Sequence, residues 1–146
     1  MTTAPSRTTH VTHTEAETEA VGASLAAALA ANDVVLLSGP LGAGKTAFVR
    51  GLALGLGCEL DGVSSPTFTI VQVYAGPITL QHVDLYRIAP HEVDDLALED
   101  LAEGAVMAVE WAERWARAPL DAIEVTLEPT GDTDRRITIT RPVARS

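Results

Sequence analysis

The chain has 146 residues, a formal net charge of −10 and a single cysteine. Its length suits one domain with a substantial hydrophobic core. The acidic charge argues against tight binding of DNA or RNA, or of an anionic membrane, through the protein's own surface, because such binding needs clustered Lys and Arg. One cysteine permits no disulfide within the chain, and residues 1–10 lack an apolar signal segment, so we predict a cytoplasmic protein.

The first part of the chain predicts a strand and a helix. Residues 1–9 are polar and are expected to form a flexible tail, whereas residues 10–12 read as a short strand. Thr14 and Glu17 have the spacing of a helix capping box. The helix that follows is expected to end near Asn32, with an apolar face made by Val21, Leu25 and Leu29.

The middle of the chain predicts a second strand and helix and then a hairpin. Residues 34–38 form a short apolar run typical of a buried parallel strand, and residues 46–56 have apolar side chains at helical spacing, with Gly57 as the stop. Residues 67–74 and 78–85 read as two strands of a hairpin, separated by a Gly-Pro break.

The last part of the chain predicts an acidic helix over residues 90–103, a buried strand over 106–109 and a final hairpin of 123–127 and 136–140. Residues 143–146 are expected to form a short tail. The sum predicts one α/β domain over residues 10–142, a three-layer fold of the P-loop NTPase kind. Its central sheet is mixed, mostly parallel near the centre with antiparallel strands at the edges.

The only lysine of the chain lies in a glycine-rich octapeptide over residues 39–46, Gly-Pro-Leu-Gly-Ala-Gly-Lys-Thr, which fits the phosphate-binding loop G-x-x-x-x-G-K-[ST]. The predicted strand before it and helix after it supply the context that the motif requires. Lys45 is expected to reach the β- and γ-phosphates, and the Thr46 hydroxyl to ligate Mg²⁺. The residues expected to bind the ATP phosphates are Leu41, Gly42, Ala43, Gly44, Lys45 and Thr46.

Two acids are candidates for binding magnesium and activating water. Glu110 ends the apolar run 106–109, as in a Walker B strand with Glu as the acid, and Asp84 ends a less apolar strand. We favour Glu110 as the metal-side acid and Asp84 as a second polar group, which either positions water or supports the metal site from outside its direct ligands. Thr67 is a candidate γ-phosphate sensor or partner contact, and Trp111 either covers the phosphate site or packs in the core, the core being the default.

The elements and motifs described so far leave the class of nucleotide-binding protein partly open. A GTPase is disfavoured, because the chain's one lysine is in the loop and no N-K-x-D motif exists. ATP is therefore the expected nucleotide. A small-molecule or nucleotide kinase is the alternative, although the arginines form no obvious lid segment, and a nucleotide-binding regulator without turnover is a third possibility.

Four sequence blocks make a more specific resemblance. The phosphate loop, then Ser-Ser-Pro-Thr-Phe-Thr at 64–69, His-Val-Asp-Leu-Tyr-Arg at 82–87 and Val-Glu-Trp at 109–111 resemble in order and spacing the signature of the TsaE (YjeE) family. The resemblance covers about residues 10–140. One departure is Pro40, where the family often has Asp after the first glycine of the loop.

The resemblance implies a bacterial ATPase needed for N6-threonylcarbamoyladenosine (t6A) at position 37 of tRNAs that read ANN codons. It implies the partners TsaD and TsaB, which would contact the tRNA, and an ATPase that is weak alone and stimulated by them. It assigns Mg²⁺ to Thr46 and Glu110 and a role in hydrolysis to Asp84. It also implies an adenine pocket near Thr14 and Asp134.

Overall fold

The computed structural model describes residues 6–40, 42–60, 71–93 and 96–142. Its centre is a seven-stranded sheet in the order β1-β7-β6-β2-β5-β4-β3. Leu41, Thr67 and the first part of the strand predicted over 67–74 lie outside the described residues. Among the described residues, no helix has the length and apolar character needed to span a bilayer.

The sheet is parallel at its centre and antiparallel at both edges, as predicted. β2 (Val34–Ser38) lies between β5 (Val106–Glu110) and β6 (Ile123–Pro129), and β4 (Leu80–Asp84) continues the parallel part beyond β5. The antiparallel edges are β3 (Val71–Tyr74) on β4, and β7 (Arg135–Arg141) with β1 (Ser6–Thr12) on β6. Both predicted hairpins, β3–β4 and β6–β7, are therefore confirmed.

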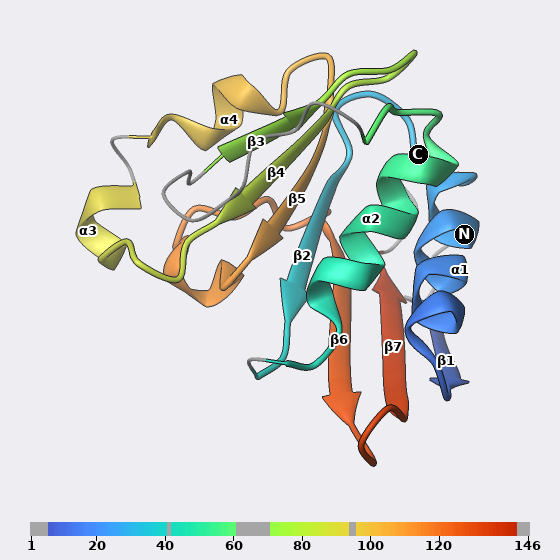
Figure 1. Cartoon of the computed structure of the whole chain (residues 1–146). Coiled ribbons are helices and arrows are strands. Elements are labelled where there is room, and N and C mark those ends of the chain that lie inside the picture. Colours follow the sequence, from blue (N-terminus) through green and yellow to red (C-terminus); the bar gives the residue numbers. More distant parts are fainter. Residues whose placement is uncertain (1–5, 41, 61–70, 94–95, 143–146) are drawn as a thin grey trace, which may run out of the picture.

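Helices and apolar segments cover the two faces of the sheet and make a three-layer fold (Figure 1). α1 (Glu15–Ala26) and α2 (Lys45–Gly55) pack on one face against β2, β6 and β7, around the fully buried Phe48. The segments that carry α3 (Pro90–Val93), α4 (Leu98–Leu101) and η2 (Ala112–Arg114) contribute to a second core on the other face. Because β5 is covered on both faces, all five of its residues are buried.

Three element boundaries differ from the sequence prediction. β1 begins at Ser6, inside the segment expected as a flexible tail, because it pairs with β7 along its whole length. α1 ends at Ala26 rather than near Asn32, since the chain must reverse into β2, and Asn32 takes a left-handed conformation with φ 79°. In place of one helix over residues 90–103, the described residues form the separate four-residue helices α3 and α4, and Ala97 just before α4 is left-handed with φ 50°.

Glycines let α1 and α2 approach each other closely. A Cβ atom built on Gly51 would lie 2.0 Å from the backbone oxygen of Glu19, and one on Gly22 would lie 2.3 Å from that of Phe48. Gly51 and Gly55 lie inside α2, where glycine lowers helix propensity. Their cost in helix propensity, up to about 1 kcal/mol each, is offset by the close contact that they allow between the helices.

The start of α1 is fixed by its cap and by the β6–β7 turn. The Thr14 hydroxyl accepts a hydrogen bond from Glu17 N, as the capping box predicts, and the Glu17 carboxylate accepts one from His13 N. His13 Nδ1 lies 3.0 Å from Asp134 Oδ1, across the gap between the helix start and the hairpin turn. The hydrogen bond from the His13 ring to the Asp134 carboxylate, with the charge of that carboxylate, raises the pKa of His13 above its ordinary value of 6.5.

We predict that Gly51→Ala destabilises the protein despite favouring helix, because the added methyl overlaps the Glu19 backbone. Overpacking of this kind costs about 1–3 kcal/mol, against a propensity gain near 1 kcal/mol. Urea unfolding measures the difference. Leu54→Ala, at a half-exposed position of the same helix, is the control and should change the midpoint little. A Gly51→Ala variant more stable than wild type would refute the close packing.

We also predict that Asp134→Asn lowers the pKa of His13 toward 6.5, because the partner charge is removed. Since the folded-state pKa is raised, the pair stabilises the fold below about pH 6.5, and this contribution is lost as the pH rises through the raised value. An NMR titration of the His13 ring protons, assigned with His13→Gln, measures the shift. The same His13 pKa in wild type and Asp134→Asn would contradict the contact.

Candidate functional site

The carboxyl ends of three parallel strands meet at one edge of the sheet, beside the phosphate loop. Asp84 ends β4 and Glu110 ends β5, and the two residues are direct partners in the strand register. Glu110 is likewise the register partner of Leu37 on β2, one residue before that strand ends. Because side chains alternate along a strand, His82, Asp84 and Glu110 share the sheet face that carries α2. The structure thus brings the two predicted acids together next to the loop.

The phosphate loop turns from β2 into α2 through glycines in conformations that other residues rarely adopt. Gly44 is the N-cap of α2 with φ 97°, so the loop leads directly into the first turn of the helix. At Gly39 a Cβ atom would lie 2.5 Å from the Leu127 backbone oxygen. The loop therefore places the amino end of α2, with its free N–H groups, where an anion can bind.

Lys45 is the first residue of α2, and its side chain folds back over the loop. Its Nζ donates a 2.7 Å hydrogen bond to the Gly39 carbonyl oxygen and lies 4.4 Å from the centre of the Trp111 ring. The residue is 5% exposed. The ammonium group is thus held between one backbone carbonyl and one aromatic face beside the loop.

Trp111 takes a left-handed backbone conformation, with φ 59°, directly after Glu110. Such a conformation is strained for a bulky residue and often marks a functional site. The ring lies 5.0 Å from the ring of Tyr86 and is partly exposed. Trp111 packs against the second core, as the default prediction has it, and also lines the cavity described below.

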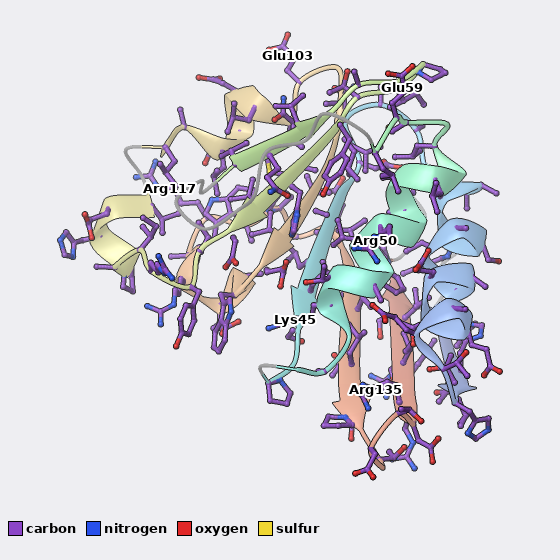
Figure 2. The ribbon with its side chains drawn as sticks, viewed as in Figure 1. Lys45, Arg50, Glu59, Glu103, Arg117 and Arg135 are labelled. Carbon is purple, nitrogen blue, oxygen red and sulfur yellow. The ribbon has the colours of Figure 1, made fainter. Side chains whose placement is uncertain are left out.

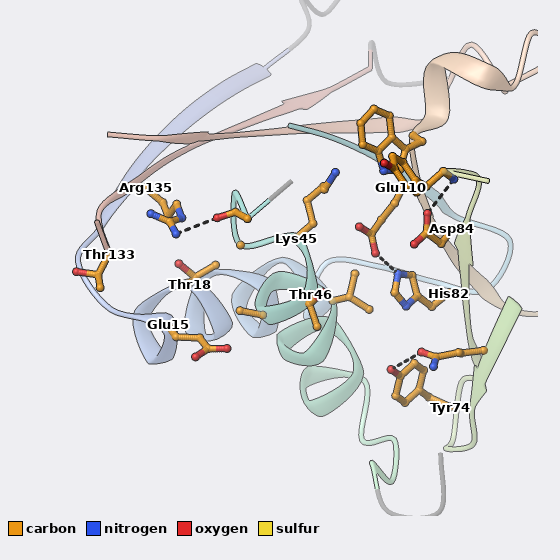
Figure 3. Close-up of a pocket in the computed structure, with 17 residues that line it drawn as sticks. Glu15, Thr18, Lys45, Thr46, Tyr74, His82, Asp84, Glu110, Thr133 and Arg135 are labelled. Atoms are coloured by element: carbon orange, nitrogen blue, oxygen red, sulfur yellow. Dashed lines mark hydrogen bonds and ion pairs between the residues drawn. The ribbon is translucent and has the colours of Figure 1, made fainter. Parts of the chain in front are cut away.

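Glu110 is held by a histidine that the sequence analysis did not select. The Glu110 Oε2 and His82 Nε2 atoms are hydrogen bonded, and both residues are buried (Figure 3). His82 lies on β4 two residues before Asp84, and its partner lies 28 residues away in the sequence. The sequence shows His82 as a polar residue within an otherwise buried strand, but no nearby residue indicates that its partner is Glu110.

Asp84 is more accessible than Glu110. Its Oδ1 accepts a 2.9 Å hydrogen bond from the backbone N–H of Tyr86, which fixes the side chain at the strand end. Asp84 is only partly buried, so its carboxylate can contact water in the cavity. The two acids are therefore in different settings, one buried and paired with histidine and one near solvent.

A cavity of about 530 Å³ lies beside the phosphate loop and the start of α2, whose residues form part of its lining (Figure 3). One side carries the acids, with Thr46, Gln72 and Tyr74. The opposite side is formed by the start of α1 and the β6–β7 turn, through Glu15, Thr18, Thr133 and Arg135. The adenine pocket implied by the resemblance was expected near Thr14 and Asp134. Their immediate neighbours line the cavity, whereas Thr14 caps α1 and Asp134 contacts His13.

Arg135 is the second residue that sequence reasoning missed. It lies at the start of β7, close to the loop end of the molecule where Lys45 also lies (Figure 2). Its Nη2 donates a 3.0 Å hydrogen bond to the Gly42 carbonyl oxygen, and it lines the cavity. The contact joins residues 93 positions apart, so no local pattern predicts it.

Cys58 plays no part in this site. Its side chain is buried, and its Sγ donates to the Ile78 carbonyl oxygen. Burial raises the pKa of the thiol, which keeps it in the unreactive neutral form.

Comparison with known proteins agrees with this geometry. The sequence model of the family described as threonylcarbamoyl adenosine biosynthesis protein TsaE matches residues 12–137. A TsaE protein of Treponema pallidum is 44% identical over 109 residues, covering 73% of this chain and 80% of that protein. One of Bacillus subtilis is 41% identical over 127 residues, covering 85% and 79%.

A solved structure is similar over almost the whole fold. The crystal structure of Bacillus subtilis YdiB superposes with a TM-score of 0.76 and 33% sequence identity, covering 97% of this chain and 87% of that chain. With the family model spanning most of the sequence and relatives above 40% identity over most of its length, this chain belongs to the TsaE family.

Proposed function

We propose that this protein binds and hydrolyses ATP with Mg²⁺ in the biosynthesis of t6A at position 37 of tRNAs that read ANN codons, acting with TsaD and TsaB. The observation that carries the proposal is the junction of a phosphate loop with two strand-end acids: Lys45 and the amino end of α2 face a cavity that Asp84 and Glu110 also line. The names of the relatives, all tRNA threonylcarbamoyladenosine biosynthesis proteins, supply the pathway.

Phosphate binding follows from the loop. The N–H groups at the start of α2 and the helix dipole attract the phosphate oxygens. Lys45 Nζ exchanges its contact with the Gly39 oxygen for the β- and γ-phosphates. The ring of Trp111 limits the directions in which the lysine can move.

The residues of the site fit a nucleotide-bound Mg²⁺ ion. The described residues include no cluster of three or more His, Cys, Asp or Glu side chains that could hold a metal ion. Mg²⁺ at a nucleotide site needs no such cluster, because it uses one or two protein oxygens with phosphates and water. The Thr46 hydroxyl and the Glu110 carboxylate are hard oxygen donors that line the cavity. The ion would neutralise charge that develops on the phosphate oxygens during transfer.

The two acids, Glu110 and Asp84, have different roles in the proposed hydrolysis. Glu110 is buried and its Oε2 is bonded to His82, so its carboxylate is fixed in direction before nucleotide binds. Asp84, nearer to solvent and held by the Tyr86 N–H, accepts a hydrogen bond from the attacking water and orients it toward the γ-phosphate. This division follows from burial: the fixed acid suits the metal and the accessible acid suits water.

The net charge agrees with an indirect role in tRNA modification. A chain of net charge −10 is a poor tRNA ligand by itself, so TsaD and TsaB would provide the tRNA contact. ATP hydrolysis would then reset the partner complex between turnovers, which explains why activity should be low alone and higher with partners.

We predict that Lys45→Ala lowers ATP affinity and partner-stimulated ATPase activity by roughly 100-fold or more, because the main cation at the phosphates is lost. Calorimetric ATP titration and phosphate release with TsaD–TsaB measure the two effects. Arg50→Ala, at an exposed position of the same helix, is the control and should behave like wild type. Wild-type binding and turnover by Lys45→Ala would rule out the loop as the ATP site.

We predict that Glu110→Gln reduces partner-stimulated ATPase activity by roughly 100-fold while the fold is kept, because glutamine can still bond His82 but carries no charge for Mg²⁺. Phosphate release as a function of Mg²⁺ concentration measures this. Glu113→Gln, an exposed acid three residues later, is the matched control. Full activity of Glu110→Gln would overturn the assignment of Glu110 to Mg²⁺. Separately, wild-type turnover that depended on a small-molecule acceptor instead of TsaD–TsaB would favour a kinase.

A further inference from the structure

The outer side of the phosphate loop is held by residues from elsewhere in the chain. A loop that points its N–H groups at an anion turns carbonyl oxygens away from it, and a donor from elsewhere in the chain can fix the direction of such a carbonyl. The Gly42 carbonyl oxygen receives the Nη2–H of Arg135 at 3.0 Å. Gly42 has a left-handed φ of 79°, so the direction of its carbonyl is set by a conformation specific to the loop.

The other side of the Arg135 guanidinium is bonded to its own hairpin turn. Nη1 donates to the backbone oxygens of Gly131 at 3.2 Å, Asp132 at 3.4 Å and Asp134 at 2.8 Å. The planar guanidinium thus lies between the turn and the loop, with backbone oxygens on both sides. A lysine ammonium, a single point on a flexible stem, cannot bridge the same set of oxygens.

The hairpin turn is itself anchored and can serve as a support. The Thr130 N–H donates a 2.9 Å hydrogen bond to the backbone oxygen of Asp134. The carboxylate of Asp134 contacts His13, just before α1. The β6 strand of the same hairpin approaches the loop a second time at Gly39, where only a residue without a side chain clears the Leu127 oxygen. The phosphate loop is therefore in contact with the β6–β7 hairpin near both Gly39 and Gly42.

We propose that Arg135 is a positioning residue for ATP: it holds the Gly42 carbonyl outward and so fixes the part of the loop that leads into the N–H groups at the amino end of α2. Arg135 acts through the loop backbone and does not contact the reacting atoms. The inference rests on the proposed function of the loop as the ATP site. It adds that the C-terminal hairpin controls the phosphate end of the site as well as the opposite end of the cavity.

Removing Arg135 should weaken phosphate binding more than nucleoside binding. The loop would have to fix the Gly42 peptide without a charged donor, and hydrogen bonds to charged groups are among the stronger ones. We expect Arg135→Ala to bind ATP and inorganic tripolyphosphate about 10-fold more weakly, with adenosine binding unchanged. Arg135→Lys should be intermediate, because the charge remains but the bridging geometry is lost. In partner-stimulated hydrolysis the KM should rise more than kcat falls.

Calorimetric titration with ATP, tripolyphosphate and adenosine tests the proposal on wild type, Arg135→Ala, Arg135→Lys and Arg136→Ala. Arg136 is the matched control, since it is the next residue of the same strand, is exposed, and pairs only loosely with Glu128 at 3.9 Å. Thermal unfolding of each variant identifies losses that come from misfolding, and Arg135→Lys keeps the test valid if Arg135→Ala is unstable.

The results of these titrations distinguish a positioning role of Arg135 from the alternatives. Weaker ATP and tripolyphosphate binding in both Arg135 variants, with Arg136→Ala like wild type, supports the proposal. Wild-type affinities in the Arg135 variants, or a loss confined to adenosine, overturn it, the second result making Arg135 a contact of the nucleoside. Failure of wild type itself to bind ATP would instead refute the proposed function.

Discussion

The parallel register of β2, β5 and β4 is the constraint on which the site depends. It brings the phosphate loop, Glu110 and Asp84 to one edge of the sheet, because parallel strands end on the same side. The register also places both acids and His82 on the face covered by α2, so a slip by one residue would turn all three side chains to the opposite face. The close packing of α1 on α2 then holds the helix whose first turn lines the cavity.

The site combines a local positive field with an acidic protein. The net charge of −10 repels a nucleotide at long range. In the proposed site the amino end of α2 and Lys45 would attract the phosphates, whereas Glu110 and Asp84, which line the same cavity, would repel them. On this account a Mg²⁺ ion would lie between the carboxylates and the phosphates and offset that repulsion.

The parts of the fold that the sequence predicts are those set by local pattern. The strand before the phosphate loop, the helix after it, the capping box at Thr14 and the acid at the end of β5 follow from runs of a few residues. His82 and Arg135 could not be assigned in this way, because their partners lie 28 and 93 residues away and depend on strand register. The helix predicted over residues 90–103 was wrong for a related reason: the second core holds the segment as two short helices, which alternating acids and leucines do not reveal.

The central claim is that an intact phosphate loop is needed for tRNA modification. The most direct test is mass-spectrometric measurement of threonylcarbamoyladenosine in tRNA from cells depleted of this protein and complemented with wild type or Lys45→Ala. The account predicts that the modified nucleoside disappears on depletion and returns only with wild type. Unchanged levels after depletion, or full restoration by Lys45→Ala, would contradict it.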